Sequence, residues 1–430
     1  MKIAIIGSGI SGLTCGYHLH RHHDVTVFEA SDYIGGHTAT VDVQVNGQDY
    51  AVDTGFIVFN DRTYPNFMAM LDKLGVRYTE TEMSFSVRND YNGLEYNGHT
   101  LATMFAQKRN LFSPRFYYFI WEILRFNRLA KQSVDQDLQN EQTLGEFLQQ
   151  HGFSDYFSQN YILPMGAAIW SSTLADMRAS PLPFFIRFFL NHGLLDVTNR
   201  PQWYVLTGGS RSYIGPMTQG FSDRILLRSP VTRVTRTANG VSLLVNGEQH
   251  QFDQVIFACH SDQALAMLAD ASPLETETLS AMAYQANDVI LHTDTRLLPK
   301  RKSAWAAWNY WIQANQTQPA PRQEEKLPSL TYNMNCLQHI EAEQTFCVSL
   351  NCLDQIDQSK VLRKFSYHHP VFTRQSVAAQ ANKSSIDGVM RSWFCGAYWY
   401  NGFHEDGVRS ALDVVAGIER LSAQLEQGAA

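Results

Sequence analysis

The first 29 residues contain the feature that most constrains the fold of this 430-residue chain. An apolar run, Lys2 to Ile6, leads into Gly7-Ser8-Gly9-Ile10-Ser11-Gly12, and a helical pattern follows. A second apolar run, Val25 to Phe28, ends at Glu29 and Ala30. Strand, G-x-G-x-x-G, helix, strand and acid in this order predict a dinucleotide site, with phosphates at the helix N-terminus and the carboxylate on a ribose. An ordinary glycine-rich loop, the alternative, would not need that order.

Composition and charge narrow the class of protein. Hydrophobic residues make up 44% of the chain and charged residues 17%, which is typical of a globular protein. Lys and Arg number 34 against 41 Asp and Glu, and this net charge of −7 argues against nucleic-acid binding. The six cysteines form no C-x-x-C pair, and no run is long and apolar enough to span a bilayer. We therefore expect a cytoplasmic protein.

Three segments after Glu29 resemble a known family. They are Gly35-Gly36-His37-Thr38, a β-hairpin pattern around Asn46-Gly47, and Asp53-Thr54-Gly55. Together with the N-terminal motif they resemble the FAD-dependent amine oxidase superfamily, which includes monoamine oxidases, protoporphyrinogen oxidases and phytoene-type desaturases. The resemblance implies that the Gly-Gly pair passes close to FAD and that Thr54 and Gly55 lie beside the flavin. His37 stands where the family usually has arginine.

Two later segments extend the resemblance. Val231 begins a predicted β-meander, and Asp253 to Ala258 returns as a strand; a generic meander is the alternative. In the family, backbone at the Val231 position meets the adenine. Ser392 to Ala397 is a predicted strand that ends near Gly396, and Gly407-Val408 opens a predicted helix with Asp406 as its N-cap. The resemblance implies that this helix points its N-terminus at the flavin.

The family pattern implies the domain organisation. The expected fold class is α/β: a Rossmann-like FAD-binding domain, with a parallel sheet and a β-meander, and an inserted α+β substrate domain. Residues 1–60, 205–290 and 388–425 are assigned to the FAD-binding domain, and 61–204 and 291–387 to the substrate domain. No second G-x-G-x-x-G motif is present for NAD(P)H, so hydride is expected to come from the substrate.

Tyr398 and His404 are candidate catalytic residues, because they lie between the two C-terminal segments that resemble the family. Tyr398 is expected to line the substrate face and His404 to move a proton, whereas the alternative is a packing aromatic and a loop histidine. Many amine oxidases hold a water at the flavin with a lysine, but no lysine stands between Val231 and Lys300. Cys395 occupies a small-residue position, so FAD is expected to be non-covalent. No metal site is expected.

Residues 101–131 are unusual for an acidic protein. Six basic residues accompany a single acid, Glu122, and eight aromatic residues are interleaved with them. A basic, aromatic amphipathic segment predicts peripheral contact with an anionic membrane surface, at the inner face of the membrane. The alternative is a buried helix with solvated arginines. The basic residues are Lys108, Arg109, Arg115, Arg125, Arg128 and Lys131.

These observations predict an FAD-dependent oxidoreductase that takes hydride from an apolar, lipid-like substrate, such as a fatty acyl chain or an isoprenoid. Three alternatives stay open. They are a flavin-dependent double-bond isomerase, an amine oxidase, and a non-catalytic lipid carrier on the same fold. The intact set of Gly7, Gly9, Gly12, Glu29 and Gly36 argues against the carrier. The sequence does not indicate the electron acceptor.

Overall fold

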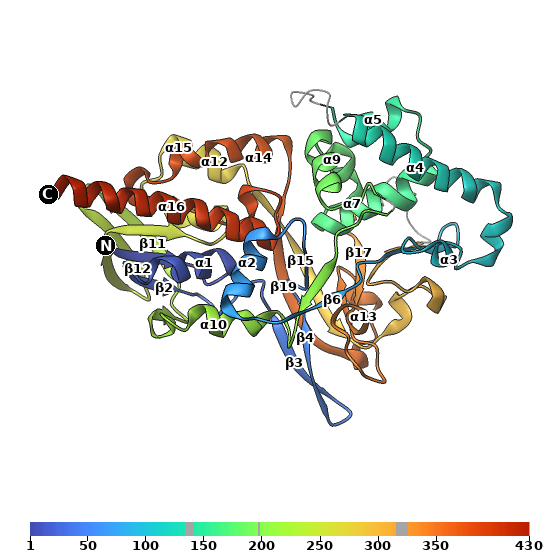
Figure 1. The fold of residues 1–430 in the computed structure, drawn as a ribbon, viewed down its shortest axis with the longest axis horizontal. Coiled ribbons are helices and arrows are strands. Elements are labelled where there is room, and N and C mark those ends of the chain that lie inside the picture. Colours follow the sequence, from blue (N-terminus) through green and yellow to red (C-terminus); the bar gives the residue numbers. More distant parts are fainter. Residues whose placement is uncertain (134–141, 197, 315–325, 430) are drawn as a thin grey trace.

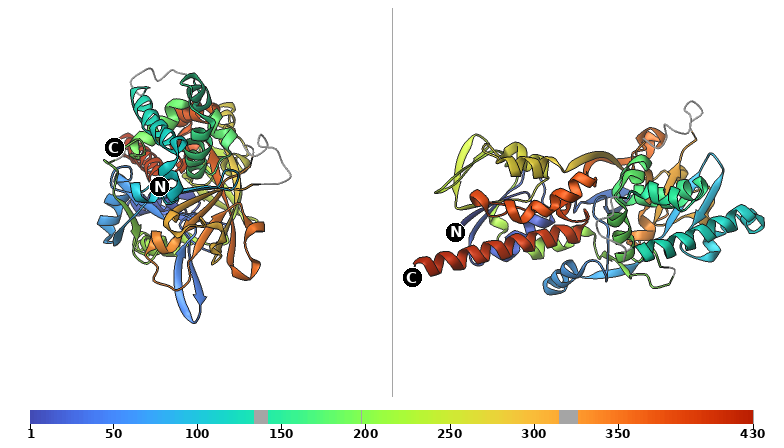
Figure 2. Two further views of the ribbon diagram at one scale, coloured as in Figure 1. Left: turned by 90° about the vertical axis from the view of Figure 1, so that its right-hand side faces the viewer. Right: turned by 90° about the horizontal axis from the view of Figure 1, so that it is seen from above.

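The molecule is elongated and has two halves along one long axis (Figures 1 and 2). This computed structural model describes residues 1–133, 142–196, 198–314 and 326–429. One half contains a parallel sheet, the long helix α16 (His404–Ala429) and both ends of the chain. The other half contains helices from α3 (Leu101–Met104) to α9 (Leu182–Asn191).

The parallel sheet organises the first half. Within the described residues its strands lie in the order β10 (Ile225–Leu226), β2 (Asp24–Phe28), β1 (Lys2–Ile6), β14 (Gln254–Phe257) and β20 (Ser392–Phe394). Each neighbouring pair is parallel. Ile3 and Ile5 pack into the core formed with α1 (Ile10–Leu19) and α16, whereas Ala4 and Ile6 join the core beneath the meander. Both faces of β1 are therefore buried, which explains its unbroken apolar sequence.

Two antiparallel units match the patterns expected from Asn-Gly turns. The hairpin is β3 (Thr40–Val45) with β4 (Gln48–Asp53), and both Asn46 and Gly47 have positive φ angles, of 52° and 78°. The meander is β11 (Val231–Thr237), β12 (Gly240–Val245) and β13 (Glu248–Phe252). The chain then returns through β14 beside β1. The predicted Rossmann-like fold, with parallel sheet and meander, is confirmed.

The second half is built on a mixed sheet covered by helices. Among the described residues its strand order is β19 (Val361–Val371), β15 (Ala283–His292), β18 (Cys347–Leu350), β17 (Ser329–Asn333), β16 (Trp308–Ile312), β7 (Phe85–Asn89) and β8 (Leu94–Asn97). The long pair β15 and β19 lies between the two halves (Figure 1). Since β15 continues past residue 290, the boundary expected there falls inside a strand; the domain limits stay a prediction.

A buried ion pair ties together three elements of the first half. Arg236 on β11 donates to both carboxylate oxygens of Glu275 at 2.5 and 2.9 Å, and the two side chains are each 1% exposed. The same guanidinium donates to Asp270 and to Ser392 Oγ on β20. Glu275 lies in the first turn of α12 (Pro273–Ser280), so this arginine joins the meander to both α12 and the parallel sheet.

We predict that Arg236→Met lowers the free energy of unfolding by about 3–5 kcal/mol, because it leaves the Glu275 carboxylate buried without its partner. Chemical denaturation monitored by circular dichroism measures the change. Arg211→Met is the matched control. It breaks the ion pair with Asp42, in which the Arg211 side chain is 44% exposed and the Asp42 side chain 65% exposed. The free energy of unfolding should fall by less than about 1 kcal/mol. Equal losses in the two variants would contradict the role given to Arg236.

Candidate active site

The predicted glycine turn lies between β1 and α1. The Gly7 N–H donates to Phe28 O at 2.9 Å, which joins the turn to the end of β2. A Cβ at Gly12 would lie 2.0 Å from Gly7 O, so the first turn of α1 can approach β1 only with glycine there. Gly9 is the N-cap of α1, and no side chain caps the helix. The N–H groups of this helix N-terminus are therefore available to an anion.

Glu29 lies at the end of β2, where the sequence predicts a ribose contact. Its carboxylate accepts from the Ser8 N–H at 2.9 Å, the Ser8 hydroxyl at 2.6 Å and the Ser31 N–H at 2.8 Å. Ala30 beside it is exposed. The Ser229 N–H, two residues before Val231, donates to Glu29 O at 2.8 Å. The meander segment that was matched to the adenine position thus begins next to the predicted ribose site.

The two loops that were matched to the flavin family pack against the glycine turn and each other. The Gly35 N–H donates to Ser8 O at 3.1 Å, and Gly36 lies beside Gly9. A Cβ at Gly55 would lie 2.1 Å from His37 O, which makes glycine necessary at this crossing. Segments separated by about 20–45 residues in the sequence therefore converge at one end of the parallel sheet.

The N-terminus of α16 reaches the same place. The Ser11 hydroxyl on α1 donates to Gly407 O at 3.0 Å, and the Gly396 N–H donates to Ser410 Oγ at 2.9 Å. Val408 is buried. Two helix N-termini, those of α1 and α16, thus adjoin the loops described above, which is the arrangement expected from the sequence.

The predicted start of α16 is wrong by one turn. The helix begins at His404 instead of Gly407, and Asp406 lies in its first turn instead of at the N-cap. The Asp406 carboxylate accepts from the Phe403 N–H at 2.9 Å. Glu405 accepts from the N–H groups of Asn66 and Phe67, at the start of α2 (Pro65–Leu74). These carboxylates satisfy N–H groups of two helix starts, which stabilises the extra turn.

His404 is part of a buried hydrogen-bond chain. Its Nε2 hydrogen-bonds with Tyr213 Oη at 2.9 Å, and Tyr213 Oη shares a hydrogen bond with Thr38 Oγ1 at 2.5 Å. The imidazole stacks on Phe56, with ring centroids 3.7 Å apart. Burial lowers the pKa of His404 to about 3, so the ring is neutral at physiological pH. His404 can exchange a proton within this chain but carries no charge at rest.

A cluster of histidines that sequence analysis missed surrounds His37. The rings of His260 and His369 lie 6.3 and 5.6 Å from the His37 ring, and Tyr367 lies at 5.2 Å. His369 Nδ1 also approaches the Asn287 amide nitrogen on β15 at 3.2 Å. Burial, followed by the neighbouring histidines, lowers the pKa of His37 to about 3 and of His369 to about 4. No sequence pattern joins these residues, because they come from four separate segments.

Among the polar atoms that are buried without a hydrogen-bond partner within the described residues, two belong to candidate site residues. They are His37 Nε2 and the Tyr398 hydroxyl. Tyr398 packs beside Tyr284 and Trp399 in the core under the meander, and is 3% exposed. A buried polar atom without a partner costs about 1–3 kcal/mol, which a bound polar molecule would recover. The glycine turn and His37, which follows the Gly36 that lies beside Gly9, fit a bound dinucleotide. The Tyr398 hydroxyl lies within the core, and the catalytic role of Tyr398 stays a prediction.

Two buried carboxyl groups border the same loops. Asp53 accepts from the Thr40 hydroxyl at 2.6 Å and the Ser210 N–H at 2.9 Å, and burial raises its pKa to about 6. Burial likewise raises the pKa of Asp406 to about 7. Above its raised pKa each group must hold a charge in a poorly solvated place.

We predict that Asp406→Asn flattens the dependence of stability on pH. The folded pKa of Asp406, about 7, lies above the unfolded value of about 3.9, so the folded state keeps a proton that the unfolded state has lost. Its contribution to the free energy of unfolding is therefore lost as pH rises toward 7. Denaturation measurements give the free energy of unfolding at each pH. Between about pH 5 and pH 8 this free energy should fall less in the variant than in the unmodified protein, by about 2 kcal/mol.

Asp42→Asn serves as the control for this measurement. The Arg211 guanidinium lowers the pKa of the exposed Asp42 carboxyl, so its contribution disappears only below the ordinary carboxyl range. In this variant the pH dependence of the free energy of unfolding between about pH 5 and pH 8 should be the same as in the unmodified protein. A pH dependence in Asp406→Asn identical to that of the unmodified protein would contradict the burial effect.

The described part of the chain contains neither a candidate metal site nor a candidate membrane-spanning helix. No group of three or more His, Cys, Asp or Glu residues in it is arranged to hold a metal ion. Nor does any helix in those ranges combine the length and apolarity needed to cross a membrane.

Comparisons with known proteins agree with this geometry. Cyclohexylamine oxidase from Brevibacterium oxydans IH-35A shares the fold with a TM-score of 0.69 and 14% identity, over 98% of this chain and 99% of that one. The CLA-producing fatty acid isomerase from P. acnes gives a TM-score of 0.66 and 14% identity, over 96% and 97%. A probable flavin-containing monooxygenase 1 from Arabidopsis thaliana is 39% identical over 80 residues, which are 17% of this chain and 15% of that protein.

The family model of flavin-containing amine oxidoreductases matches residues 10–343, or 334 of the 430 residues. This match includes α1, the Gly-Gly loop and the meander. The chain belongs to the flavin-containing amine oxidoreductase family and is an FAD-dependent oxidoreductase.

Proposed function

We propose that this protein oxidises an apolar, lipid-like molecule, such as a fatty acyl chain or an isoprenoid, with non-covalently bound FAD. The flavin, when bound, supplies the hydride acceptor. The protein must therefore orient a C–H bond, exclude water and accommodate a proton. The observation that carries the proposal is the apolar character of the wall next to residues 401–404.

This wall consists of aromatic side chains from α7 (Leu163–Trp170) and α9, together with Phe372 just after β19 and Phe403 just before α16. Phe188 on α9 stacks on Phe403 with centroids 4.9 Å apart, and Trp170 lies 4.7 Å from Phe188. Phe184 stacks on Phe372 at 5.0 Å. Hydrophobic side chains next to the start of α16 favour an uncharged, apolar substrate, since a cation there would lose hydration while the nearby Glu405 and Asp406 carboxylates already accept hydrogen bonds from backbone N–H groups.

The expected FAD contacts support non-covalent binding. The N-termini of α1 and α16 would face the phosphates and the flavin, and Glu29 the ribose. Cys395 on the loop after β20 is fully buried, and its sulfur lies 3.9 Å from Cys15 Sγ. Burial raises the pKa of the Cys395 thiol, which disfavours the thiolate that a covalent link would need.

The polar side of the site distinguishes this proposal from an amine oxidase. β15 contains no lysine; Asn287 on that strand approaches His369 instead. The neighbouring histidines have pKa values lowered by burial and so stay uncharged. A neutral, poorly hydrated lining suits hydride removal from a carbon chain.

A double-bond isomerase is the second candidate. The fold shared with the CLA-producing fatty acid isomerase from P. acnes supports it. An isomerase would consume substrate without an electron acceptor and leave the flavin oxidised at the end of turnover. A dehydrogenase would leave the flavin reduced when no acceptor is present.

We predict that fatty acyl or isoprenoid substrates bleach the flavin absorbance under anaerobic conditions, and that primary amines do not. His404→Asn should keep the oxidised flavin spectrum but slow bleaching by about 10²-fold, because the chain to Tyr213 and Thr38 loses its imidazole. Tyr398→Phe should bleach at nearly the original rate if the ring alone contributes. Stopped-flow spectroscopy measures all three proteins.

The outcomes separate the candidates. Bleaching by amines and not by lipids would make the protein an amine oxidase. Loss of the lipid with a shifted double bond, and no net flavin reduction, would establish the isomerase. An unchanged rate in His404→Asn would contradict the proton-handling role of His404.

A further inference from the structure

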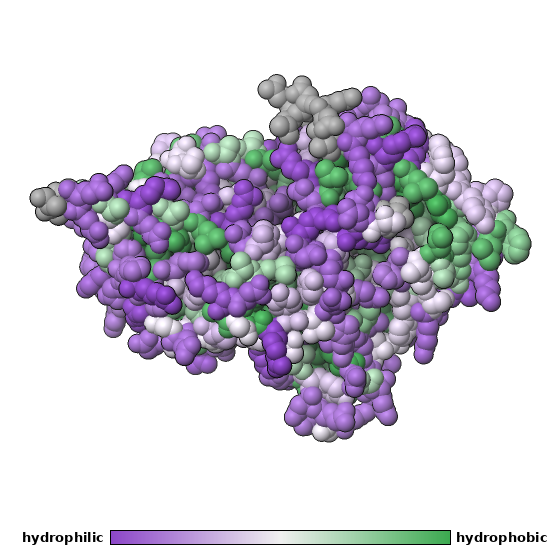
Figure 3. All heavy atoms as spheres, in the orientation of Figure 1, coloured by the Kyte–Doolittle hydropathy of each residue, from purple (hydrophilic) through white to green (hydrophobic). Residues whose placement is uncertain are grey.

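Exposed hydrophobic side chains gather at one end of the molecule. Of the fifteen large hydrophobic side chains that are exposed in the described residues, seven lie between residues 101 and 124. Phe112 is 88% exposed and Leu101 77%. Figure 3 shows hydrophobic residues gathered at the end of the molecule where Figure 1 places α4 (Pro114–Ser133). We call these seven side chains the apolar face: Leu101, Leu111, Phe112, Tyr117, Tyr118, Trp121 and Leu124.

Helix α4 is apolar on two opposite sides. Its inner side, with Phe116, Phe119 and Phe126, is buried in the main hydrophobic core. On its outer side Tyr118 stacks on Trp121, with centroids 5.3 Å apart and both rings about half exposed. A helix that only packs on its own protein needs one apolar side. The outer aromatic side therefore calls for a partner outside the chain.

The charges around the apolar face are positive. Lys108, Arg109, Arg115, Arg128 and Lys131 are exposed. Glu122, the single acid in residues 101–131, is fully buried and accepts hydrogen bonds from the N–H and hydroxyl of Ser154. The solvent side of this segment thus presents aromatic rings and cations, of which Lys131 pairs with Asp196.

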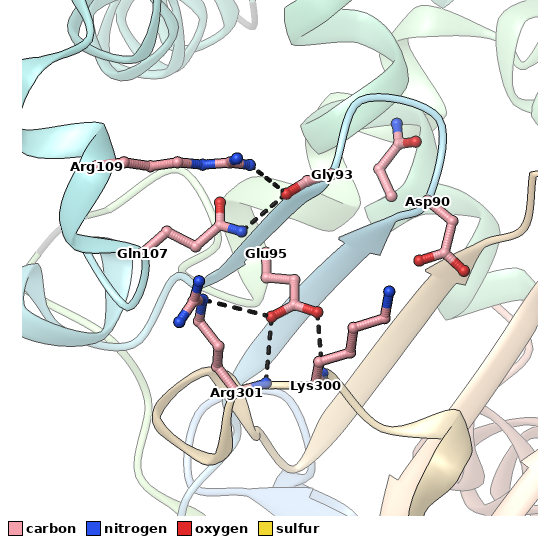
Figure 4. Close-up of a pocket in the computed structure, with 8 residues that line it drawn as sticks. Asp90, Gly93, Glu95, Gln107, Arg109, Lys300 and Arg301 are labelled. Atoms are coloured by element: carbon pink, nitrogen blue, oxygen red, sulfur yellow. Dashed lines mark hydrogen bonds and ion pairs between the residues drawn. The ribbon is translucent and has the colours of Figure 1, made fainter.

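A pocket of about 390 Å³ extends the positive charge beyond the helices. It is lined in part by Arg109, Lys300 and Arg301 (Figure 4). Arg109 donates to Gly93 O at 2.6 Å, which fixes the guanidinium at the rim. Two carboxylates also line the pocket. Asp90 pairs with Arg88, and Glu95 accepts from the Lys300 and Arg301 backbone N–H groups and pairs with the Arg301 guanidinium. Arg109, one of the cations of residues 108–131, thus shares this pocket with Lys300 and Arg301.

We propose that the apolar face docks on the surface of an anionic lipid bilayer. Tyrosine and tryptophan side chains suit the boundary between headgroups and acyl chains, where the rings are apolar and their polar atoms stay hydrated. The surrounding Lys and Arg residues attract anionic headgroups. A protein partner with acidic residues would match the positive charge. It would not match the wide spread of the half-exposed rings over this surface. Docking does not depend on the proposed substrate, and it would give access to one that resides in the membrane.

Flotation with lipid vesicles tests the proposal on the full-length holoprotein. The protein should float with phosphatidylglycerol vesicles at low salt, bind pure phosphatidylcholine vesicles weakly, and dissociate as salt approaches about 1 M, where charges are screened within about 3 Å. Lys108→Gln with Arg128→Gln should weaken binding by about 30-fold, from about 1 kcal/mol per cation. Phe112→Ser with Trp121→Ser should weaken it by at least about tenfold.

Matched controls lie on α16 at the opposite end of the molecule. Leu425→Ser and Arg420→Gln change an exposed leucine and an exposed arginine, and should leave flotation unchanged. Absence of flotation by the unmodified protein, or equal flotation of all variants, would overturn the proposal. So would a dimer in solution that Phe112→Ser with Trp121→Ser dissociates, because the face would then bind a second copy. Flotation needs no turnover, so it fails or succeeds independently of the proposed reaction.

Discussion

Close contact between backbone segments at the end of the parallel sheet is the constraint on which the rest of the structure depends. Gly12 lets α1 start against Gly7 O, and Gly55 lets its turn cross His37 O. Any larger side chain would separate these segments, because a Cβ would lie about 2 Å from a carbonyl oxygen. The N-termini of α1 and α16 then meet, joined by the Ser11 hydroxyl and Gly407 O. Two positive helix ends at one place make this the natural position for the diphosphate and flavin of FAD.

The features predicted correctly depend on short-range patterns. The strand, glycine turn and helix of residues 2–21, and the Asn-Gly hairpin of residues 40–53, each follow from neighbouring residues, and the structure contains both. The histidine cluster had no such signal, because His37, His260 and His369 meet only after the sheet and β19 have formed. The start of α16 was misplaced for a similar reason. Glu405 binds N–H groups of α2, almost 340 residues away, and this tertiary contact extends the helix beyond its local pattern.

Burial sets the chemistry of the site by keeping its histidines neutral and by holding protons on two of its carboxyl groups to a higher pH than usual. His37, His369 and His404 have lowered pKa values, and Asp53 and Asp406 raised ones, with desolvation the largest cause in each case. Neutral imidazoles can share protons through hydrogen bonds without placing a charge of their own beside the aromatic wall formed by α7, α9, Phe372 and Phe403. An apolar substrate that enters from a membrane would then meet neutral imidazoles and aromatic rings. The apolar face on α4 and the aromatic wall of the site thus both suit an apolar substrate.

The visible absorption spectrum of the purified protein, recorded before and after acid precipitation, determines whether the protein binds FAD non-covalently. We expect the protein to be yellow, with the absorption bands of oxidised flavin. FAD should be released into the supernatant when the protein is precipitated. Flavin that stays in the precipitate would contradict non-covalent binding. A colourless protein that cannot be reconstituted with added FAD would contradict the account as a whole, since two helix N-termini and an acid at the end of β2 would then lack their ligand.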